Sequence, residues 1–148
     1  MTPLPAALGG TGLVAWRLET TRHFSTWHTA QGAFLVGGRW SSAGHRVIYT
    51  SLDPSTAIIE VGVHKGLDTL DTVPHTLLEI AIGDPAQVHV VDLATHPLVV
   101  LPSVVSSHSW NVLIDVARAV ELFTLLGSEH FALDPRLNPR SVPRKTRP

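Results

Sequence analysis

Four polar residues stand inside apolar stretches, and the two arginines among them could bind an anion. They are Arg17 in "AWRLE", Arg39 in "GGRW", Tyr49 in "RVIYTS" and Glu60 in a mostly apolar helical pattern. A guanidinium fork matches phosphate oxygens, and a carboxylate can oppose a developing positive charge. The same charges could instead pair with each other, because a buried charge needs a partner. The residues alone therefore leave an anion site and a structural ion pair both open.

The elements that carry these residues follow an irregular order of strands and helices. Apolar, β-branched and aromatic residues predict strands over residues 13–19, 46–51, 76–82, 87–93 and 97–105, the last broken at Pro102. Asp53 as N-cap and Pro54 in the first turn predict a helix that ends at Gly66 and carries Glu60 beside its apolar stripe. Strands outnumber helices, which favours an α+β fold over a doubly wound sheet.

Two segments are harder to assign. Residues 20–36 mix polar residues with Trp27 and are predicted to form a long loop, a kind of segment that often carries function. Within residues 110–126, helical spacing is kept by Leu113, Val116, Val120 and Phe123, whereas "AVELFTLL" also suits a strand. The pattern leaves helix and strand open for this stretch.

The composition limits the class of protein. The chain has 148 residues, a formal net charge of −1 and no cysteine, so we expect one domain with a sizeable core and neither disulfides nor a zinc–thiolate site. No apolar run approaches the about 20 residues that span a bilayer, and the first twelve residues lack Lys and Arg. We expect a soluble, cytoplasmic protein that binds no membrane. Only residues 138–148 are strongly basic, so direct nucleic-acid binding is not expected.

The sequence lacks the motifs of several common types of catalytic or binding site. The nine histidines are scattered, without HExxH or another ligand spacing, so we predict no metal site. The chain has no GxSxG nucleophile elbow, no GxxxxGK[ST] loop and no GxGxxG loop. The sequence therefore gives no support for an α/β-hydrolase or for a P-loop or Rossmann nucleotide site.

Five segments in this order resemble the RES domain, a family of bacterial toxins paired with Xre-type antitoxins. They are "AWRLE", "GGRWSSAGHRVIYTS", "STAIIEVGVH", "LVVLPSVV" followed by "WNVLID", and "FALDPRL". We take residues 13–137 as the RES domain, between a flexible N-terminus of residues 1–12 and a basic, Pro-rich tail of residues 138–148. The resemblance implies a single α+β domain with a mixed sheet and few helices, like ADP-ribosyltransferase toxins of the diphtheria-toxin type, with a cleft for NAD.

The resemblance also implies a function and a set of site residues. RES toxins deplete NAD by cleaving its nicotinamide–ribose bond, so NAD is the expected substrate, with phosphate as co-substrate if the reaction is phosphorolysis rather than hydrolysis, and no metal is expected. By motif, the expected catalytic residues are Glu60, Arg39 and Ser103, and the expected NAD-binding residues are Arg17, Arg39, Tyr49, Ser103 and Asn111. An Xre-like antitoxin that blocks the cleft is the expected partner.

The sequence departs from the family pattern at two places. RES domains carry more chain than is found here around residues 93–102, so one wall of the cleft is expected to be shorter, and the family's "NP" is replaced by Asp115–Val116. Two alternative functions stay open: mono-ADP-ribosylation of a host protein, and a degenerate, non-catalytic module that only binds the antitoxin. We further expect Trp40 to pack under its loop rather than contact a ligand.

Overall fold

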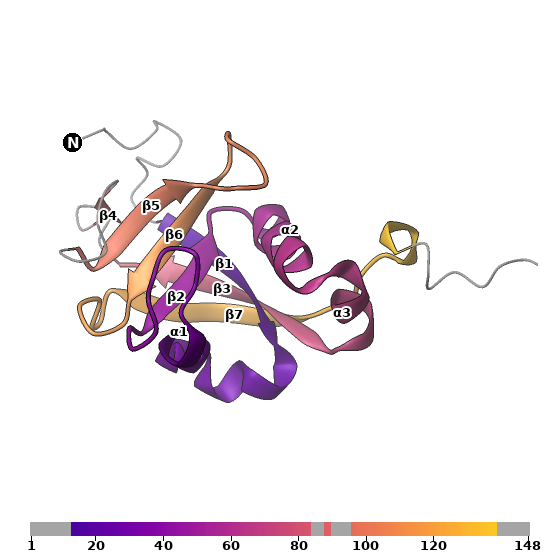
Figure 1. The fold of residues 1–148 in the computed structure, drawn as a ribbon. Helices are drawn as coiled ribbons and strands as arrows, with labels where there is room; N and C mark the ends of the chain where they lie inside the picture. Colours follow the sequence, from indigo (N-terminus) through magenta and orange to yellow (C-terminus); the bar gives the residue numbers. More distant parts are fainter. Residues whose placement is uncertain (1–12, 84–87, 90–95, 139–148) are drawn as a thin grey trace, which may run out of the picture.

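A mixed β-sheet is the centre of the computed structural model, which describes residues 13–83, 88–89 and 96–138 (Figure 1). In this described part of the chain the sheet has seven strands. From one edge to the other they are β4 (Val88–His89), β5 (Leu98–Pro102), β6 (Trp110–Asp115), β2 (Val47–Ser51), β1 (Leu13–Thr20), β3 (His75–Ile82) and β7 (Phe123–Phe131). The β4–β5 pair is parallel and all the other neighbouring pairs are antiparallel.

The sheet is divided between β1 and β2. These two strands share a single pair of residues, Trp16 with Ser51. By contrast, β1 pairs with β3 over its whole length, from Leu13 to Thr20. Where β1 and β2 diverge, their facing backbone groups lack strand partners and need others.

Helices cover both faces of the sheet (Figure 1). Helices α2 (Pro54–Lys65) and α3 (Leu67–Thr72) lie over one face, where Ile58 and Val61 pack against Leu18 and Leu77. On the opposite face lie the 3₁₀ helix η2 (Thr21–Thr29) and helix α1 (Gln31–Val36), which precede β2 in the chain. The chain ends, within the described residues, with the short 3₁₀ helix η4 (Pro135–Leu137).

Local sequence rules predict α2 correctly. The Asp53 side chain accepts a hydrogen bond from the backbone N–H of Thr56 at 2.8 Å and thereby caps the helix, and Pro54 occupies the first turn. Gly66, with φ of +88°, ends the helix. The predicted strands over residues 13–19, 46–51 and 76–82 are confirmed, and β5 ends at Pro102 as expected. Of the strand predicted over 87–93, only residues 88–89 lie inside the described residues.

The prediction of a long loop over residues 20–36 is wrong. This segment forms η2 and α1, because Trp27 is buried in the main core and packs edge-on against Phe123. The ambiguous stretch 110–126 is not a helix: β6 and the start of β7 occupy it, and Val120, assigned to the helical stripe, is 68% exposed. The buried Val112 and Ile114 face the main core from β6.

The chain ends expected to be flexible, residues 1–12 and 139–148, lie outside the described residues. Asn138, which we assigned to the tail, is buried, and its amide donates to Asp68 at 2.9 Å. None of the helices in the described part of the chain has the length and apolar character needed to cross a membrane.

Candidate functional site

Three predicted site residues meet at the carboxylate of Glu60. Glu60 Oε1 accepts hydrogen bonds from Ser103 Oγ at 2.7 Å and from Asn111 Nδ2 at 2.8 Å. The backbone N–H of Val104 donates to the same oxygen at 3.3 Å. The donors come from the residue after β5, the loop that follows and the start of β6, whereas the carboxylate comes from α2. We call Glu60, Ser103 and Asn111 the carboxylate cluster.

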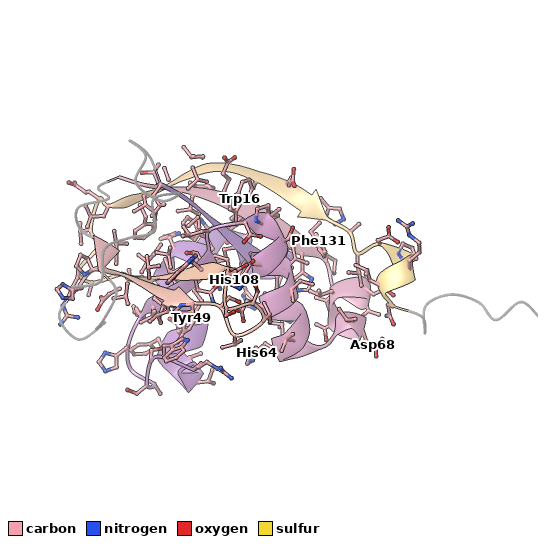
Figure 2. The ribbon with its side chains drawn as sticks, turned by 90° about the horizontal axis from the view of Figure 1, so that it is seen from above. Trp16, Tyr49, His64, Asp68, His108 and Phe131 are labelled. Carbon is pink, nitrogen blue, oxygen red and sulfur yellow. The ribbon has the colours of Figure 1, made fainter. Side chains whose placement is uncertain are left out.

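Strand pairing and a hydrogen-bonded loop hold the carboxylate cluster in place. On β6, Asn111 pairs with Ser51 of β2, and Ser51 Oγ donates to Asn111 Oδ1 at 2.7 Å. Because the amide oxygen is occupied by Ser51, the amide nitrogen faces Glu60. Ser103 follows the last residue of β5, and its backbone N–H donates to Ser109 O at 2.8 Å, which closes the loop between β5 and β6. Figure 2 shows the segment that carries His108 alongside α2.

The second oxygen of Glu60 is available. Glu60 Oε2 accepts no hydrogen bond from the residues that the structure describes, and it is not buried. No Lys, Arg or His of the described residues forms a salt bridge with Glu60. The neutral donors therefore orient the carboxylate without neutralising its charge, and one oxygen is left for a ligand.

Arg17 bridges the divergence between β1 and β2. Its Nε and Nη2 donate to Glu19 Oε2 at 2.9 and 2.7 Å, and its Nη1 donates to the backbone carbonyl of Tyr49 at 3.0 Å. Arg17 thus forms a structural ion pair, but its partner is Glu19 and not Glu60. Glu19 was not among the predicted site residues. Its position two residues from Arg17 on a predicted strand, hence on the same face, was the signal available.

Arg39 and Trp40 form the tip of a tight turn that Tyr49 supports. The turn is closed by the backbone N–H of Gly38, which donates to Ser41 O at 2.8 Å. Tyr49 Oη accepts from the backbone N–H of Trp40 at 3.2 Å and shares a hydrogen bond with Ser41 Oγ at 2.9 Å. A Cβ on Gly38 would lie 2.5 Å from Tyr49 Oη, so a larger residue at this position would require the tyrosine side chain to shift.

The Arg39 side chain is exposed and makes no hydrogen bond or ion pair with other described residues. Our expectation that Trp40 packs under its loop is wrong, because Trp40 is 47% exposed. The side chain that lies against Gly38 in this turn is that of Tyr49. The structure thus joins Arg39 to Tyr49 through the turn and Arg17 to Tyr49 through the backbone. No hydrogen bond links either arginine to the carboxylate cluster.

Two ionisable side chains near Glu19 were not predicted as part of the site. Lys65 Nζ donates to Thr20 Oγ1 at 3.3 Å; partial burial lowers the pKa of Lys65, while the negative charge of Glu19 opposes that change. His75 is fully buried, with Nδ1 2.6 Å from Val73 O and no partner for Nε2. Burial lowers the pKa of His75. Among the described residues, no group of three or more His, Cys, Asp or Glu is placed to hold a metal ion.

Comparison with known proteins places these features in a family. The family model described as "RES domain" matches residues 14–98. The protein named Toxin Res from Photorhabdus laumondii subsp. laumondii is 32% identical over 119 residues, which cover 80% of this chain and 66% of that protein. Toxin Res from Pseudomonas putida is 35% identical over 74 residues, which cover 49% of this chain and 48% of that protein. This chain therefore spans about two thirds of the first relative and about half of the second.

A solved structure shares the fold. A chain in the crystal structure of the M. tuberculosis MbcT–MbcA toxin–antitoxin complex superposes with a TM-score of 0.67 at 14% sequence identity, over 87% of this chain and 88% of that chain. The prediction of an α+β, ADP-ribosyltransferase-like domain with a mixed sheet and few helices is confirmed. Because the family model spans more than half of the sequence, this chain belongs to the RES domain family.

Proposed function

We propose that this chain is an NAD-cleaving toxin in which Glu60 stabilises positive charge on the ribose as nicotinamide departs. The observation that carries the proposal is the carboxylate of Glu60, with Oε1 held by Ser103 and Asn111 and Oε2 unoccupied. Membership of the RES domain family and similarity to proteins named Toxin Res support it. With intracellular NAD as the substrate, the site of action is the cytoplasm.

The reaction needs a carboxylate but no general acid. When the bond between ribose C1′ and the nicotinamide nitrogen breaks, its electron pair goes to the ring and neutralises the pyridinium. The ribose then passes through an oxocarbenium-like state, as in glycoside hydrolysis. An oxygen of water or phosphate adds to C1′ and completes hydrolysis or phosphorolysis. Glu60 Oε2 would accept a hydrogen bond from a ribose hydroxyl, and its negative charge would oppose the positive charge on the ribose. Electrostatic stabilisation of this kind accelerates such steps.

The two arginines are proposed as phosphate ligands. Arg39 lies at the tip of its turn with its guanidinium free of partners among the described residues, so it can reach a phosphate of NAD or an incoming inorganic phosphate. Arg17 retains unused N–H groups after its contacts with Glu19 and Tyr49. We propose that Tyr49 serves NAD binding by holding the Arg39 turn.

Ser103 and Asn111 are proposed to act on the substrate through Glu60. Both use a hydrogen bond to orient the carboxylate, at 2.7 and 2.8 Å. Their role in this proposal is therefore to fix the direction in which Oε2 meets the ribose, in line with the need for preorganised charge at the reacting centre.

Product analysis of the purified full chain with NAD tests the proposal. We expect nicotinamide together with ADP-ribose, or with ADP-ribose phosphate when inorganic phosphate is present. With labelled NAD, label on protein would instead favour ADP-ribosyl transfer. Glu60→Gln keeps the shape and can keep the three hydrogen bonds while removing the charge, so turnover should fall by about 100-fold or more.

Glu129→Gln, on an exposed position of β7, is the matched control and should retain full turnover. Near-normal loss of NAD in Glu60→Gln, with an unchanged melting temperature, would refute the role given to Glu60. No NAD consumption by the wild-type chain would overturn the enzymatic proposal and favour a binding module.

We also propose an antitoxin as the partner, of the Xre-like type expected from the sequence. The structural neighbour is part of a toxin–antitoxin complex. In this chain, apolar side chains next to Glu60 are exposed: Ile59 by 43%, Val63 by 68% and Val104 by 46%. Exposed apolar surface of this kind is typical of a docking site. Co-purification of the product of an adjacent gene, with loss of NAD turnover on binding, is the expected result.

A further inference from the structure

We propose that Glu19 is a positioning residue for NAD binding. It holds the guanidinium of Arg17 in the divergence between β1 and β2, so that the unused N–H groups of Arg17 bind a phosphate of the dinucleotide. The inference rests on the proposed function and assigns a role to a residue outside the predicted site.

The carboxylate of Glu19 is buried, and both of its oxygens accept hydrogen bonds. Glu19 is buried, with 8% of its surface exposed, and its Oε1 accepts the backbone N–H of Thr20 at 3.0 Å. Its Oε2 accepts two N–H groups of Arg17, at 2.9 and 2.7 Å. A buried carboxylate with both oxygens engaged has little freedom to move, so it sets the direction of the guanidinium.

The position of Arg17 follows from the divided sheet. In an antiparallel pair the N–H and C=O of one residue point to the same side. The carbonyl of Tyr49 accepts from Arg17 Nη1 at 3.0 Å, so it points toward β1, where strand pairing with β2 is limited to Trp16 and Ser51. The guanidinium therefore replaces a strand–strand hydrogen bond and is held from both sides of the divergence.

Two N–H groups of Arg17 remain. A guanidinium has five, one on Nε and two on each terminal nitrogen. The three hydrogen bonds in the structure use one on each nitrogen, which leaves one N–H on Nη1 and one on Nη2. The Arg17 side chain is 24% exposed, so part of it is accessible from solvent. Each of these N–H groups can donate a charge-assisted hydrogen bond to a phosphate oxygen.

The surrounding charge is compatible with an anion. Glu19 and Arg17 cancel each other, but Lys65 is close enough to interact with both charges and is tied to Thr20 at 3.3 Å. With Lys65 protonated, the three side chains together carry a net charge of +1. Glu19 therefore contributes orientation rather than attraction, and removing its charge should weaken binding although the local charge becomes more positive. If electrostatic attraction alone governed binding, removing the charge of Glu19 would strengthen NAD binding instead.

Steady-state kinetics of NAD turnover test the inference, with the melting temperature measured for each purified full-length variant. We expect Glu19→Gln to raise KM for NAD by about tenfold or more, the range for loss of a charge-assisted hydrogen bond, with a smaller change in kcat. Arg17→Ala should raise KM at least as much. In the Arg17→Ala background, adding Glu19→Gln should raise KM no further, because the positioned group is gone. Glu129→Gln again serves as the control.

Each other result decides against the inference. A lower melting temperature with unchanged KM in Glu19→Gln would show a purely structural role. Additive rises of KM in the double variant would show that Glu19 acts independently of Arg17, and a lower KM in Glu19→Gln would show that net charge dominates. Should Glu19→Gln fail to fold, a wild-type KM in Arg17→Ala would still overturn the inference. Absence of NAD turnover in the wild type is a separate outcome, which overturns the proposed function itself.

Discussion

Replacing Asn111 with aspartate would set a second carboxylate against Glu60 at almost constant size. In the structure Asn111 Nδ2 donates to Glu60 Oε1 at 2.8 Å, while Oδ1 accepts from Ser51 at 2.7 Å. Aspartate keeps the acceptor for Ser51 and replaces the donor with an oxygen. The two carboxylates can then remain in contact only if they share a proton, so the substitution raises the pKa of the pair.

The size of the effect follows from the distance. Two unit charges 2.8 Å apart repel by about 1.5 kcal/mol in bulk water and about 6 kcal/mol at an effective dielectric constant of 20. Glu60 is half-buried, so the bulk-water value is the lower bound of the repulsion. Since about 1.36 kcal/mol corresponds to one pH unit, the last proton of the pair should leave at a pH at least about one unit higher than for a single carboxylate.

The two measurable consequences have opposite signs. The folded variant binds the proton more tightly than the unfolded chain, so its free energy of unfolding relative to the wild type decreases as pH rises through the raised pKa. NAD turnover requires the charge on Glu60 and should increase over the same pH range. Urea unfolding and NAD turnover, each measured from pH 5 to 9, give the two curves.

The matched control is Asn111→Ala, which removes the same donor without adding a charge. Its stability and turnover should fall by amounts that do not depend on pH in this range. If Asn111→Asp and Asn111→Ala gave parallel curves in both measurements, the carboxylates would not interact. The contact that defines the carboxylate cluster would then not exist in solution.

Two further predictions concern residues outside the carboxylate cluster. Tyr49→Phe keeps the ring but loses the contacts with Trp40 and Ser41, so the free energy of unfolding should fall by about 0.5–1.5 kcal/mol per hydrogen bond, and KM for NAD should rise; wild-type KM would show that the Arg39 turn does not need this support. Burial lowers the pKa of His75, so the unfolded chain binds the proton more tightly, and stability should be full above about pH 6.5 and decrease as pH falls below it. His75→Leu should remove that part of the pH dependence of the free energy of unfolding, measured by urea unfolding. An equal decrease of this free energy below about pH 6.5 in the wild type and the variant would contradict the role given to His75.

The carboxylate cluster illustrates what the sequence could predict about the site. Glu60 is separated by 43 positions from Ser103 and by 51 from Asn111, so no spacing rule brings them together. The three residues could be predicted together because each matches a motif of one family. Members of a family share a fold, so residues at matching motifs are expected to lie close together. Helix α2, by contrast, was predictable from local chemistry, since Asp53 caps it in the way isolated helices are capped.

The failures have a physical cause as well. Strand β6 is central in the sheet, and Val112, Leu113 and Ile114 are all fully buried, so the apolar run has no alternation that would distinguish a strand from a helix. The segment 20–36 looked like a loop because it is mostly polar, and its ordering depends on Trp27, whose burial is a tertiary contact. Glu19 lies two residues from Arg17 on a strand that the sequence predicts, so its place on the same face was available. Its hydrogen bonds to Arg17 are side-chain contacts, which a strand pattern does not specify.

Arg17 and Glu60 each make structural contacts and also have polar groups available for a ligand, so a structural role does not exclude a functional one. Arg17 commits three N–H groups to the fold and leaves two, and Glu60 commits Oε1 and leaves Oε2. A side chain that is already held by the fold has lost its rotamer freedom before a ligand arrives, so the entropic cost of binding is reduced. It follows that a loss of stability on substituting either residue is no argument against function. Glu60→Gln, which can preserve the structural contacts and removes the charge on the free oxygen, separates the two roles.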